Sequence, residues 1–328
     1  MTKKSKFVLL LFLIGIVVFN GYLIYTSLSP KLPQPGGDAI LYSNQCRQDL
    51  RTTIVQAIEK AQNSLHLVTF GLTDPSVLQA LEDKAKSPLF MKVFYDKRGS
   101  PPIFLSNERA VGLVNKGLVH QKILVVDEKI VFIGSANMTR SSLMMHDNLV
   151  IGFYSPEIAK FLLQKTPFFS GNLKTMVAGQ EIDIFLLPDL QNKALLALKS
   201  LLRSSKLSMQ VAMFTLTHPL LVDEIISAHK RGVKVEVYVD KKSARTVSAK
   251  AIERLQKEKV PVYTNRKLSL FHHKFILVDG RHLALGSANW TKSAFNKNND
   301  CFVILHNLRN DQKKFMKKLE RVISLEGS

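Results

Sequence analysis

Residues 120–137 read HQKILVVDEKIVFIGSAN, and residues 272–289 read HHKFILVDGRHLALGSAN. Both stretches fit the pattern His-x-Lys-x4-Asp-x6-Gly-Ser-Ala-Asn, and each matching position lies 152 residues later in the second copy. A single His-x-Lys triplet carries little information, but two copies of such a long pattern in the same register do not arise by chance. The chain therefore contains an internal duplication, and this duplication determines its architecture.

The duplication extends upstream of the two motifs. Three earlier segments recur at an offset of 144 residues. These pairs are Ile40–Ser64 with Ile184–Ser208, Leu67–Pro75 with Val211–Pro219, and Val93–Lys97 with Val237–Lys241. The offset grows from 144 to 152 before the motif, so the second half carries an insertion between Lys241 and Phe271.

Each half predicts the same order of helices and strands. Leu50–Gln62 places apolar residues on one helix face, and Leu65–Phe70 and Leu89–Tyr95 have the composition of short buried strands. Asp74 and Pro75 are a capping residue and a first helical residue, so a helix follows over Ser76–Lys86. The matching segments are Asn192–Arg203, Leu207–Phe214, Pro219–Lys230 and Val233–Val239. This alternation predicts an α/β fold of two duplicated lobes, each a central mixed sheet flanked by helices and related by a pseudo-two-fold axis.

Each motif also predicts a β-hairpin. In the first copy, Val119–Val126 forms a strand, residues 127–129 turn, and Ile130–Ile133 returns. The second copy turns at Asp279-Gly280, which is a strong hairpin signal.

Two histidines and two lysines of the motifs supply what a phosphodiester-cleaving site needs. Residues i and i+2 of a strand point to the same side, so His120 projects with Lys122, and His272 with Lys274. Cleavage requires a nucleophile, a proton for the leaving oxygen, and positive charge around the phosphoryl oxygens. These four side chains provide all three if the lobes face each other. The lysines then supply the positive charge that Mg²⁺ supplies in other phosphoryl-transfer sites. Neither a metal nor another cofactor is expected.

The paired motif resembles that of the phospholipase D superfamily, whose members carry one or two His-x-Lys-x4-Asp-x6-Gly-Ser-x-Asn elements. The resemblance covers most of the chain after about residue 38 and implies a phosphoric diester hydrolase with two phospholipase D-type lobes. It also implies a covalent mechanism, in which His120 attacks phosphorus to form a phosphohistidine and His272 protonates the leaving alcohol. Water activated by His272 then hydrolyses the intermediate, and another alcohol gives transfer instead.

The other motif residues are expected to support this chemistry. Asp127 and Asp279 end the first hairpin strand and hold the turn. Superfamily members often place an acidic residue shortly after Gly-Ser-x-Asn to orient a histidine. Asp300 lies eleven positions after the second motif, whereas the same offset in the first copy gives Asn148, with Asp147 one residue earlier. Asp147 and Asp300 are therefore the candidate orienting residues. The expected neutral phosphate-binding side chains are Ser135, Asn137, Ser287 and Asn289.

Several other conspicuous residues have structural interpretations. His273 points away from His272 and is expected to pack or lie at the surface, and His218 stands at a helix start, where it is expected to cap. Trp290 and Phe271 flank the second motif, where they either contact a substrate or pack between the lobes. The remaining histidines without partners at metal-ligand spacing include His66, His229, His282 and His306.

Length and composition indicate a folded, basic chain. Its 328 residues exceed one typical domain, and we expect lobes at residues 38–170 and 171–328. An apolar content of 46% supports sizeable cores and excludes global disorder. The formal net charge of +20 favours anionic partners. Cys46 and Cys301 are too few for a disulfide scaffold or a structural zinc site, and a single bond between them is left open.

The N-terminus predicts a membrane anchor. Phe7–Leu28 is almost wholly apolar, follows a basic segment, and is long enough to cross a hydrocarbon core. We favour an uncleaved signal-anchor over residues 1–28, followed by a linker at 29–37. A cleaved signal peptide is the alternative. The basic segment would stay in the cytoplasm, so the catalytic body would be exocytoplasmic, either anchored or exported.

The substrate is left open between phospholipid and nucleic acid. An anchor and a basic surface fit phospholipid head groups in an anionic membrane, whereas the charge alone also fits a nuclease. Export disfavours intracellular nucleic acid, so we favour lipid. An inactive binding protein is disfavoured because both motifs are intact, and a monomer suffices because one chain carries both.

Two further segments remain, one near the end of the chain and one between the predicted lobes. Asp311–Leu325 is a basic amphipathic helix that either lies on a membrane surface or packs on its lobe. Thr166–Gly179 is expected to be the crossing between the lobes.

Overall fold

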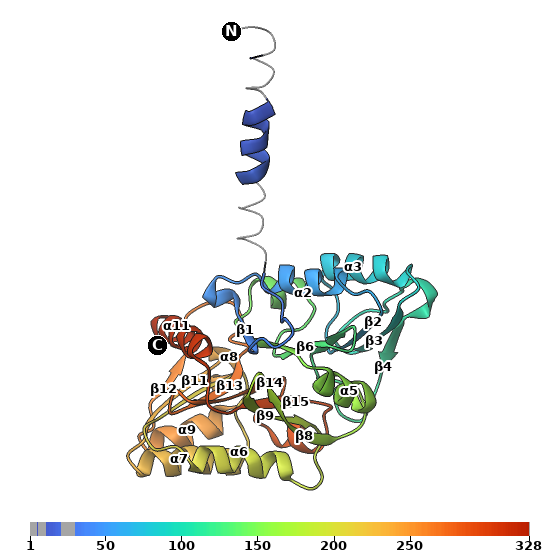
Figure 1. Cartoon of the computed structure of the whole chain (residues 1–328). Coiled ribbons are helices and arrows are strands. Elements are labelled where there is room, and N and C mark those ends of the chain that lie inside the picture. The colour runs from blue at the N-terminus through green and yellow to red at the C-terminus, as the bar shows by residue number, and fades with distance from the viewer. Residues whose placement is uncertain (1–4, 6–10, 21–29, 328) are drawn as a thin grey trace. The chain divides into compact units, whose positions relative to one another are not determined.

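The computed structural model of the protein describes residues 5, 11–20 and 30–327 (Figure 1). The chain divides into two compact units, residues 1–31 and residues 32–328. In the first unit, residues 11–20 are helical. No helix in the described part of the chain is both long and apolar enough to cross a bilayer. Most of the expected signal-anchor at residues 1–28 falls outside the described residues and stays a prediction.

The second unit contains two mixed β-sheets. The strands of the first sheet are β1 (Ile40–Tyr42), β2 (Ser64–Thr69), β3 (Phe90–Asp96), β4 (Ala110–Leu113), β5 (Ile123–Val126), β6 (Ile130–Gly134) and β7 (Val150–Tyr154). Those of the second sheet are β8 (Gly171–Val177), β9 (Gln180–Leu186), β10 (Ser208–Met213), β11 (Lys234–Val239), β12 (Val262–Thr264), β13 (Lys274–Val278), β14 (His282–Gly286) and β15 (Cys301–Leu305).

The two sheets have the same topology. The first has the order β1-β7-β6-β5-β2-β3-β4, and the second has the order β12-β11-β10-β13-β14-β15-β9-β8. When the second order is read backwards, from β8 to β12, it matches the first. In this match β9 takes the place of β1, β10 that of β2, and so on to β15 in the place of β7. Among the strands of the described residues, β8 alone has no counterpart. The predicted α/β fold of two duplicated lobes is therefore confirmed.

Helices cover the outer face of each sheet. Figure 1 shows α2 (Leu50–Glu59) and α3 (Pro75–Ala85) on the first sheet, and α6 (Lys193–Arg203), α7 (Pro219–Lys230) and α9 (Ala249–Lys257) on the second. One apolar core lies between each sheet and its own helices. A third core joins the two sheets through residues of β5–β7 and β13–β15. Because the inner strands are buried on both faces, they consist of continuous apolar runs such as ILVV in β5.

The helix starts follow the local sequence. The Asp74 carboxylate accepts hydrogen bonds from the backbone N–H groups of Ser76 and Val77 and so caps α3, with Pro75 at the first helical position. His218 occupies the same position before α7 but makes no capping hydrogen bond, so the expectation of a capping role was wrong. Its ring packs edge-on against Phe295 instead.

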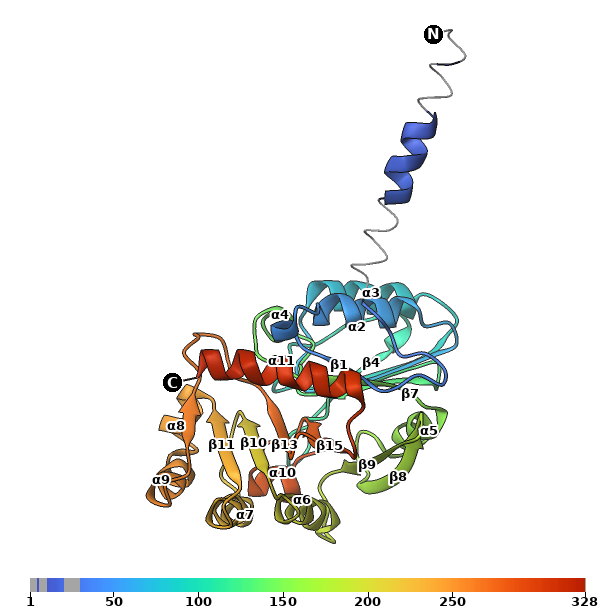
Figure 2. The same cartoon turned by 60° about the vertical axis from the view of Figure 1, so that its left-hand side comes forward.

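Two helices flank the core between the sheets. They are α5 (Pro156–Lys165) and α11 (Asn310–Glu326). Figure 2 shows α11 lying between the lobes, where its buried residues Met316, Leu319 and Ile323 join the inter-sheet core. The apolar face of this helix is therefore packed, as one of the two alternatives for Asp311–Leu325 requires, and is not available for a membrane surface.

The segment expected to cross between lobes contains an additional strand. β8 pairs with β9 across a two-residue turn at Ala178 and Gly179, whose φ angles are 47° and 73°. Positive φ at both positions suits the tight turns of hairpins. In the expected linker at 29–37, Leu32 is buried against the first lobe. Cys46 and Cys301 are buried free thiols and form no disulfide.

Candidate active site

The two motifs meet where the lobes join. His120 Nδ1 lies 2.7 Å from Asp300 Oδ1, and His272 Nδ1 lies 3.0 Å from Asn148 Oδ1. Each partner stands eleven positions after the motif of the opposite lobe. Each histidine is therefore held by a residue of the other lobe, and the two pairs obey the pseudo-two-fold symmetry of the duplication.

Backbone contacts fix this junction. The His120 N–H donates to the Asn299 carbonyl at 2.8 Å, and the Asn299 N–H donates to the Leu118 carbonyl at 2.8 Å. On the other side, the Asp147 N–H donates to the Leu270 carbonyl at 3.0 Å. These bonds join the segment that leads into each histidine, just before β5 or β13, to the loop that carries the hydrogen-bond partner of that histidine.

Two aspartates that the sequence analysis did not select hold the segments before the histidines. Asp96 ends β3 and accepts a hydrogen bond from the Val119 N–H, while Asp240 follows β11 and accepts from the Phe271 N–H. Both belong to the repeated segments VFYDK and VYVDK. Their recurrence at equivalent positions of the repeat is the sequence signal that could have identified them.

Asp300 is a buried carboxylate. Its Oδ1 accepts from His120 and from the Ser287 hydroxyl at 2.7 Å. Burial raises the pKa of Asp300, but the charges of His120 and Lys122 and the hydrogen bonds outweigh it, so the pKa is lower than usual. A carboxylate can only accept, so His120 carries its proton on Nδ1 and presents an unprotonated Nε2.

Asn148 fixes the tautomer of His272 in a comparable way. Its Nδ2 donates to the Ser142 carbonyl at 2.8 Å, while its Oδ1 accepts from the Ser135 hydroxyl at 2.8 Å. The Oδ1 therefore faces His272, and Nδ1 of His272 must be the donor. The expectation for Asp147 was wrong, because its carboxylate is not hydrogen-bonded to either histidine. Burial raises the pKa of Asp147 to about 7.

The two lysines are buried beside their histidines. Lys122 Nζ donates to the His120 carbonyl at 2.5 Å, and Lys274 Nζ donates to the His272 carbonyl at 3.0 Å. Burial lowers the pKa of Lys122 to about 7. Burial and the charge of Lys122 hold the pKa of Lys274 well below its usual value.

The positive charges of the two lysines also change the pKa values of the histidines. Burial and the neighbouring lysines lower the pKa of both His120 and His272, and the depression is larger for His272. Asp300 opposes the depression at His120, whereas His272 has only the neutral Asn148. A bound anion would relieve the repulsion among these groups, so the arrangement is suited to a phosphate.

Two phenylalanines complete the surroundings of the catalytic pairs. The Phe70 ring lies 5.6 Å from the His120 ring, with Lys122 Nζ 5.7 Å from its centroid. The Phe214 ring lies 5.2 Å from the His272 ring, with Lys274 Nζ 5.0 Å from its centroid. Phe70 and Phe214 occupy equivalent positions of the repeat, but nothing in the sequence assigned them to the site.

Asp127 and Asp279 lie away from the reacting groups and hold the hairpins. The Asp127 carboxylate accepts from three consecutive backbone N–H groups where β2 begins, and Asp279 does the same where β10 begins. Both residues have positive φ, 52° and 53°, as the hairpin turn requires. This geometry matches the supporting role expected for them.

The four expected phosphate-binding side chains divide into two kinds. The hydroxyls of Ser135 and Ser287 donate to Asn148 and Asp300, so they position these partners and are not free to bind phosphate. Within the described residues, the side-chain amide nitrogens of Asn137 and Asn289 have no hydrogen-bond partner, so both can donate to a phosphoryl oxygen.

The aromatic residues and the histidine beside the second motif are structural. Trp290 and Phe271 are only 4% and 3% exposed and belong to the apolar cores. His273 is buried between Phe271 and Phe275 and bonds Gln45 through Nε2 at 2.6 Å. A third histidine, His146, lies with its ring 6.4 Å from that of His272. No sequence signal pointed to His146.

Comparison with known proteins identifies the family of this chain. A family model described as cardiolipin synthase, PLD-like domain, matches residues 54–166 and 198–324. A mitochondrial cardiolipin hydrolase of Chlamydomonas reinhardtii is 31% identical over 104 residues, covering 32% of this chain and 46% of that protein. Its counterpart in Danio rerio is 33% identical over 123 residues, covering 36% of this chain and 54% of that protein. The chain thus spans about half the length of these curated relatives.

A solved structure extends the likeness to the whole fold. The crystal structure of phosphatidylserine synthase from Haemophilus influenzae Rd KW20 matches with a TM-score of 0.69 at 13% identity, over 90% of this chain and 88% of that one. At this identity the match shows a shared fold alone. The family model, however, covers both repeats and most of the chain. The chain therefore belongs to the phospholipase D superfamily of phosphodiesterases.

Proposed function

We propose that the protein is a phosphodiesterase that works through a covalent phosphohistidine and acts on phospholipid head groups, by hydrolysis or by phosphatidyl transfer. The observation that carries the proposal is the reciprocal pairing of His120 with Asp300 and of His272 with Asn148, each beside a buried lysine. This arrangement offers a nucleophile, a proton carrier and positive charge at one junction.

The asymmetry of the two pairs supports His120 as the nucleophile. Its unprotonated Nε2 would attack phosphorus, and the new N–P bond would leave a positive charge on the ring. The Asp300 carboxylate, 2.7 Å from Nδ1, compensates this charge. Asn148 is neutral and offers no such compensation to His272.

His272 then serves as the proton carrier. A phosphodiester anion between Lys122 and Lys274 would oppose the repulsion that lowers the pKa of His272, so the imidazolium forms when substrate is bound. The P–O bond to the alcohol breaks as Nε2 of His272 gives its proton to the leaving oxygen. In the second step His272 takes a proton from water, or from an acceptor alcohol, as that oxygen attacks phosphorus and the N–P bond breaks.

Two observations favour lipid over nucleic acid. Met144 and Met145, which directly precede His146, are 48% and 65% exposed, and Leu268, four residues before His272, is fully exposed. Exposed apolar side chains in the segments that lead to His146 and His272 suit contact with acyl chains. Trp290 and Phe271 are buried and cannot stack on a base. The names of the relatives, cardiolipin hydrolase and cardiolipin synthase, support the same choice.

We further propose that the partner is a phospholipid membrane, reached through the apolar segment at residues 7–28 and from the exocytoplasmic side. A monomer suffices, since one chain supplies both halves of the site. The alternative function is a nuclease of the same superfamily, which the net charge of +20 favours. A catalytically inactive binding protein is the least supported alternative, because all four catalytic side chains are in place.

A direct test uses the purified full-length chain in detergent micelles. Head-group release from labelled phospholipid vesicles, including cardiolipin, is compared with cleavage of labelled single-stranded DNA. Head-group release with no DNA cleavage supports the proposal, and the reverse result establishes the nuclease. No activity on either substrate would support the inactive protein.

The catalytic assignment has its own test. His120→Ala and His272→Ala should each reduce activity by at least about 10³-fold, whereas the matched control His229→Ala, on α7, should retain it. A phosphoryl group trapped on wild-type protein should be absent from His120→Ala. A trapped intermediate on the His120→Ala variant would show that His272 is the nucleophile instead.

A further inference from the structure

Four side chains with metal-binding chemistry gather at one end of the second sheet. Leu305 pairs with Ile182 on one side and with Leu283 on the other. The next residues along these strands therefore form a row across β9, β15 and β14. That row consists of Glu181, His306 and His282, and the His306 N–H donates to the Glu181 carbonyl at 3.0 Å. Asp183, two residues along β9 from Glu181, points to the same face of the sheet.

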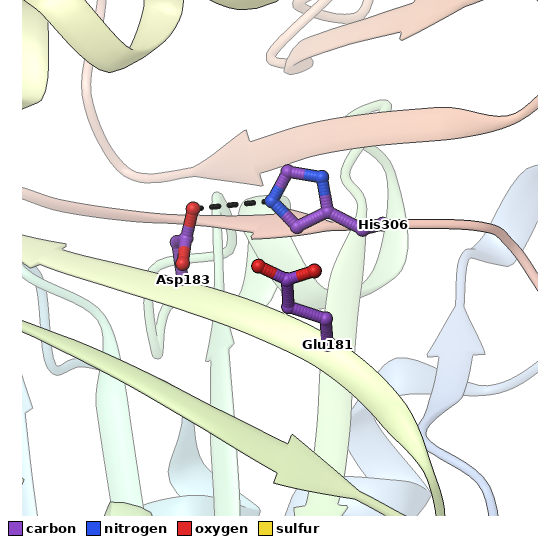
Figure 3. A group of neighbouring side chains, drawn as sticks. All are labelled: Glu181, Asp183 and His306. Atoms are coloured by element: carbon purple, nitrogen blue, oxygen red, sulfur yellow. Dashed lines mark hydrogen bonds and ion pairs between the residues drawn. The ribbon is translucent and has the colours of Figure 1, made fainter.

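The ligand atoms of three of these residues converge. Figure 3 shows Asp183, Glu181 and His306 facing one another, and one ligand atom from each lies within 4.8 Å of the others. His306 Nε2 is 3.1 Å from Asp183 Oδ2. The His282 ring lies 5.4 Å from the His306 ring. Asp183, Glu181 and His306 are thus placed to share one ion, and His282 stands beside them as the candidate fourth ligand.

An independent observation is that two buried polar atoms beside this group have no hydrogen-bond partner. Asp183 is only 5% exposed, yet within the part of the chain that the structure describes its Oδ1 accepts no hydrogen bond, and the buried Nδ1 of His282 has no partner there either. Burying such atoms unpaired is costly. A bound cation would satisfy them.

The group also borders open space. A cavity of about 420 Å³ is lined by Asp183, His282 and His306 together with residues of α6. An ion and its remaining water ligands fit there. Lys174 is the competing cation, with Nζ 3.7 Å from Asp183 Oδ1, but its side chain is 69% exposed and can turn into solvent.

We propose that Asp183, Glu181 and His306, with His282 as a fourth ligand, bind a divalent transition-metal ion, with Zn²⁺ as the best match. Imidazole nitrogens and carboxylate oxygens are ligands of Zn²⁺, whereas Mg²⁺ and Ca²⁺ prefer oxygen alone. In the sequence, His282 and His306 have no partners at metal-ligand spacing. The ligands come instead from β9 and from the neighbouring strands β14 and β15, which lie far from β9 in the chain.

The position of this site indicates a stabilising role and not a catalytic one. Asp300 and His306 lie at opposite ends of β15, six residues apart, which corresponds to about 20 Å along a strand. An ion there would join β9, β14 and β15 at the end remote from the catalytic residues. Because it binds the folded state, it would raise the unfolding temperature.

The test uses the full-length chain, stripped of metal by chelation and free of affinity tags. Zn²⁺ titration by calorimetry and Co²⁺ absorption spectroscopy are applied to wild type, His306→Ala, Asp183→Asn and the matched control His229→Ala. We expect one ion per chain, a tetrahedral Co²⁺ spectrum, and an unfolding temperature that rises with Zn²⁺. His306→Ala and Asp183→Asn should each weaken binding by at least tenfold, whereas His229→Ala should leave it unchanged.

Absence of saturable Zn²⁺ binding to wild type would overturn the proposal, as would equal affinity in wild type and both ligand variants. If either of those variants fails to fold without metal, Glu181→Gln, at an exposed position, provides the same comparison. Phosphodiesterase activity at 25 °C should not depend on the ion, so a negative result here leaves the proposed function untouched, and the reverse also holds.

Discussion

Replacing Lys122 by methionine should stabilise the protein while removing its activity. Lys122 is 2% exposed, and burial lowers its pKa from 10.5 to about 7. At about 1.36 kcal/mol per pKa unit, holding this ammonium charged in the folded state costs about 5 kcal/mol. Methionine has a similar length and carries no charge, so it removes this cost.

Lost contacts offset part of the gain. The ammonium donates to the His120 carbonyl at 2.5 Å and lies 5.7 Å from the Phe70 ring centroid. A hydrogen bond from a charged group and a buried cation–π contact together contribute about 2–4 kcal/mol. The net expectation is that Lys122→Met raises the free energy of unfolding by about 1–3 kcal/mol at pH 6.

The pH dependence identifies the cause. The folded-state pKa is depressed, so the penalty is fully present below pH 7 and fades as pH rises towards 10.5, where the unfolded side chain also loses its proton. The advantage of the variant should therefore be largest at pH 6 and shrink towards pH 10. Urea unfolding at pH 6, 8 and 10 measures this trend.

A matched control separates burial from the loss of a cation–π contact. Lys92 is exposed, and its Nζ lies 5.3 Å from the Phe90 ring. Lys92→Met should change stability by less than about 0.5 kcal/mol at each pH. The reasoning is refuted if Lys122→Met is less stable than wild type at pH 6, or if its advantage does not change with pH.

Three further outcomes are expected. Asn148→Asp places a carboxylate on His272 Nδ1 and should raise the pKa of His272, which moves the pH optimum of kcat/KM upward by about one unit; an unchanged profile would contradict the pairing. Asp279→Ala removes the acceptor of three backbone N–H groups and should lower the free energy of unfolding by about 2 kcal/mol while kcat stays near wild type, and a selective loss of kcat would place Asp279 in the chemistry. Chelation with EDTA should leave the initial rate at 25 °C unchanged, because the lysines supply the positive charge, and an abolished rate would show that a metal takes part.

The internal repeat and local sequence patterns were enough to predict the architecture. Two motifs in register, together with the upstream repeats, predicted two α/β lobes, and the sheets confirm this, since equivalent residues build equivalent strands. The turns at Asp127 and Asp279 also followed from local sequence, because a hairpin turn depends on a few adjacent residues. The strand β8 was missed, since its pairing with β9 comes from the sheet more than from its own weak pattern.

The assembly of the site, in contrast, depends on contacts between segments that are far apart in the chain. Asp300 orients His120 across 180 residues of chain, and Asn148 orients His272 across 124 residues. The repeat offset points to Asn148 as well as to Asp300, but no local pattern shows that each histidine finds its partner in the opposite lobe. Burial has the same origin: packing of the two sheets removes Lys122 and Lys274 from water and shifts their pKa values. Sequence specifies which groups are present, whereas distances and desolvation arise only when separate segments pack together.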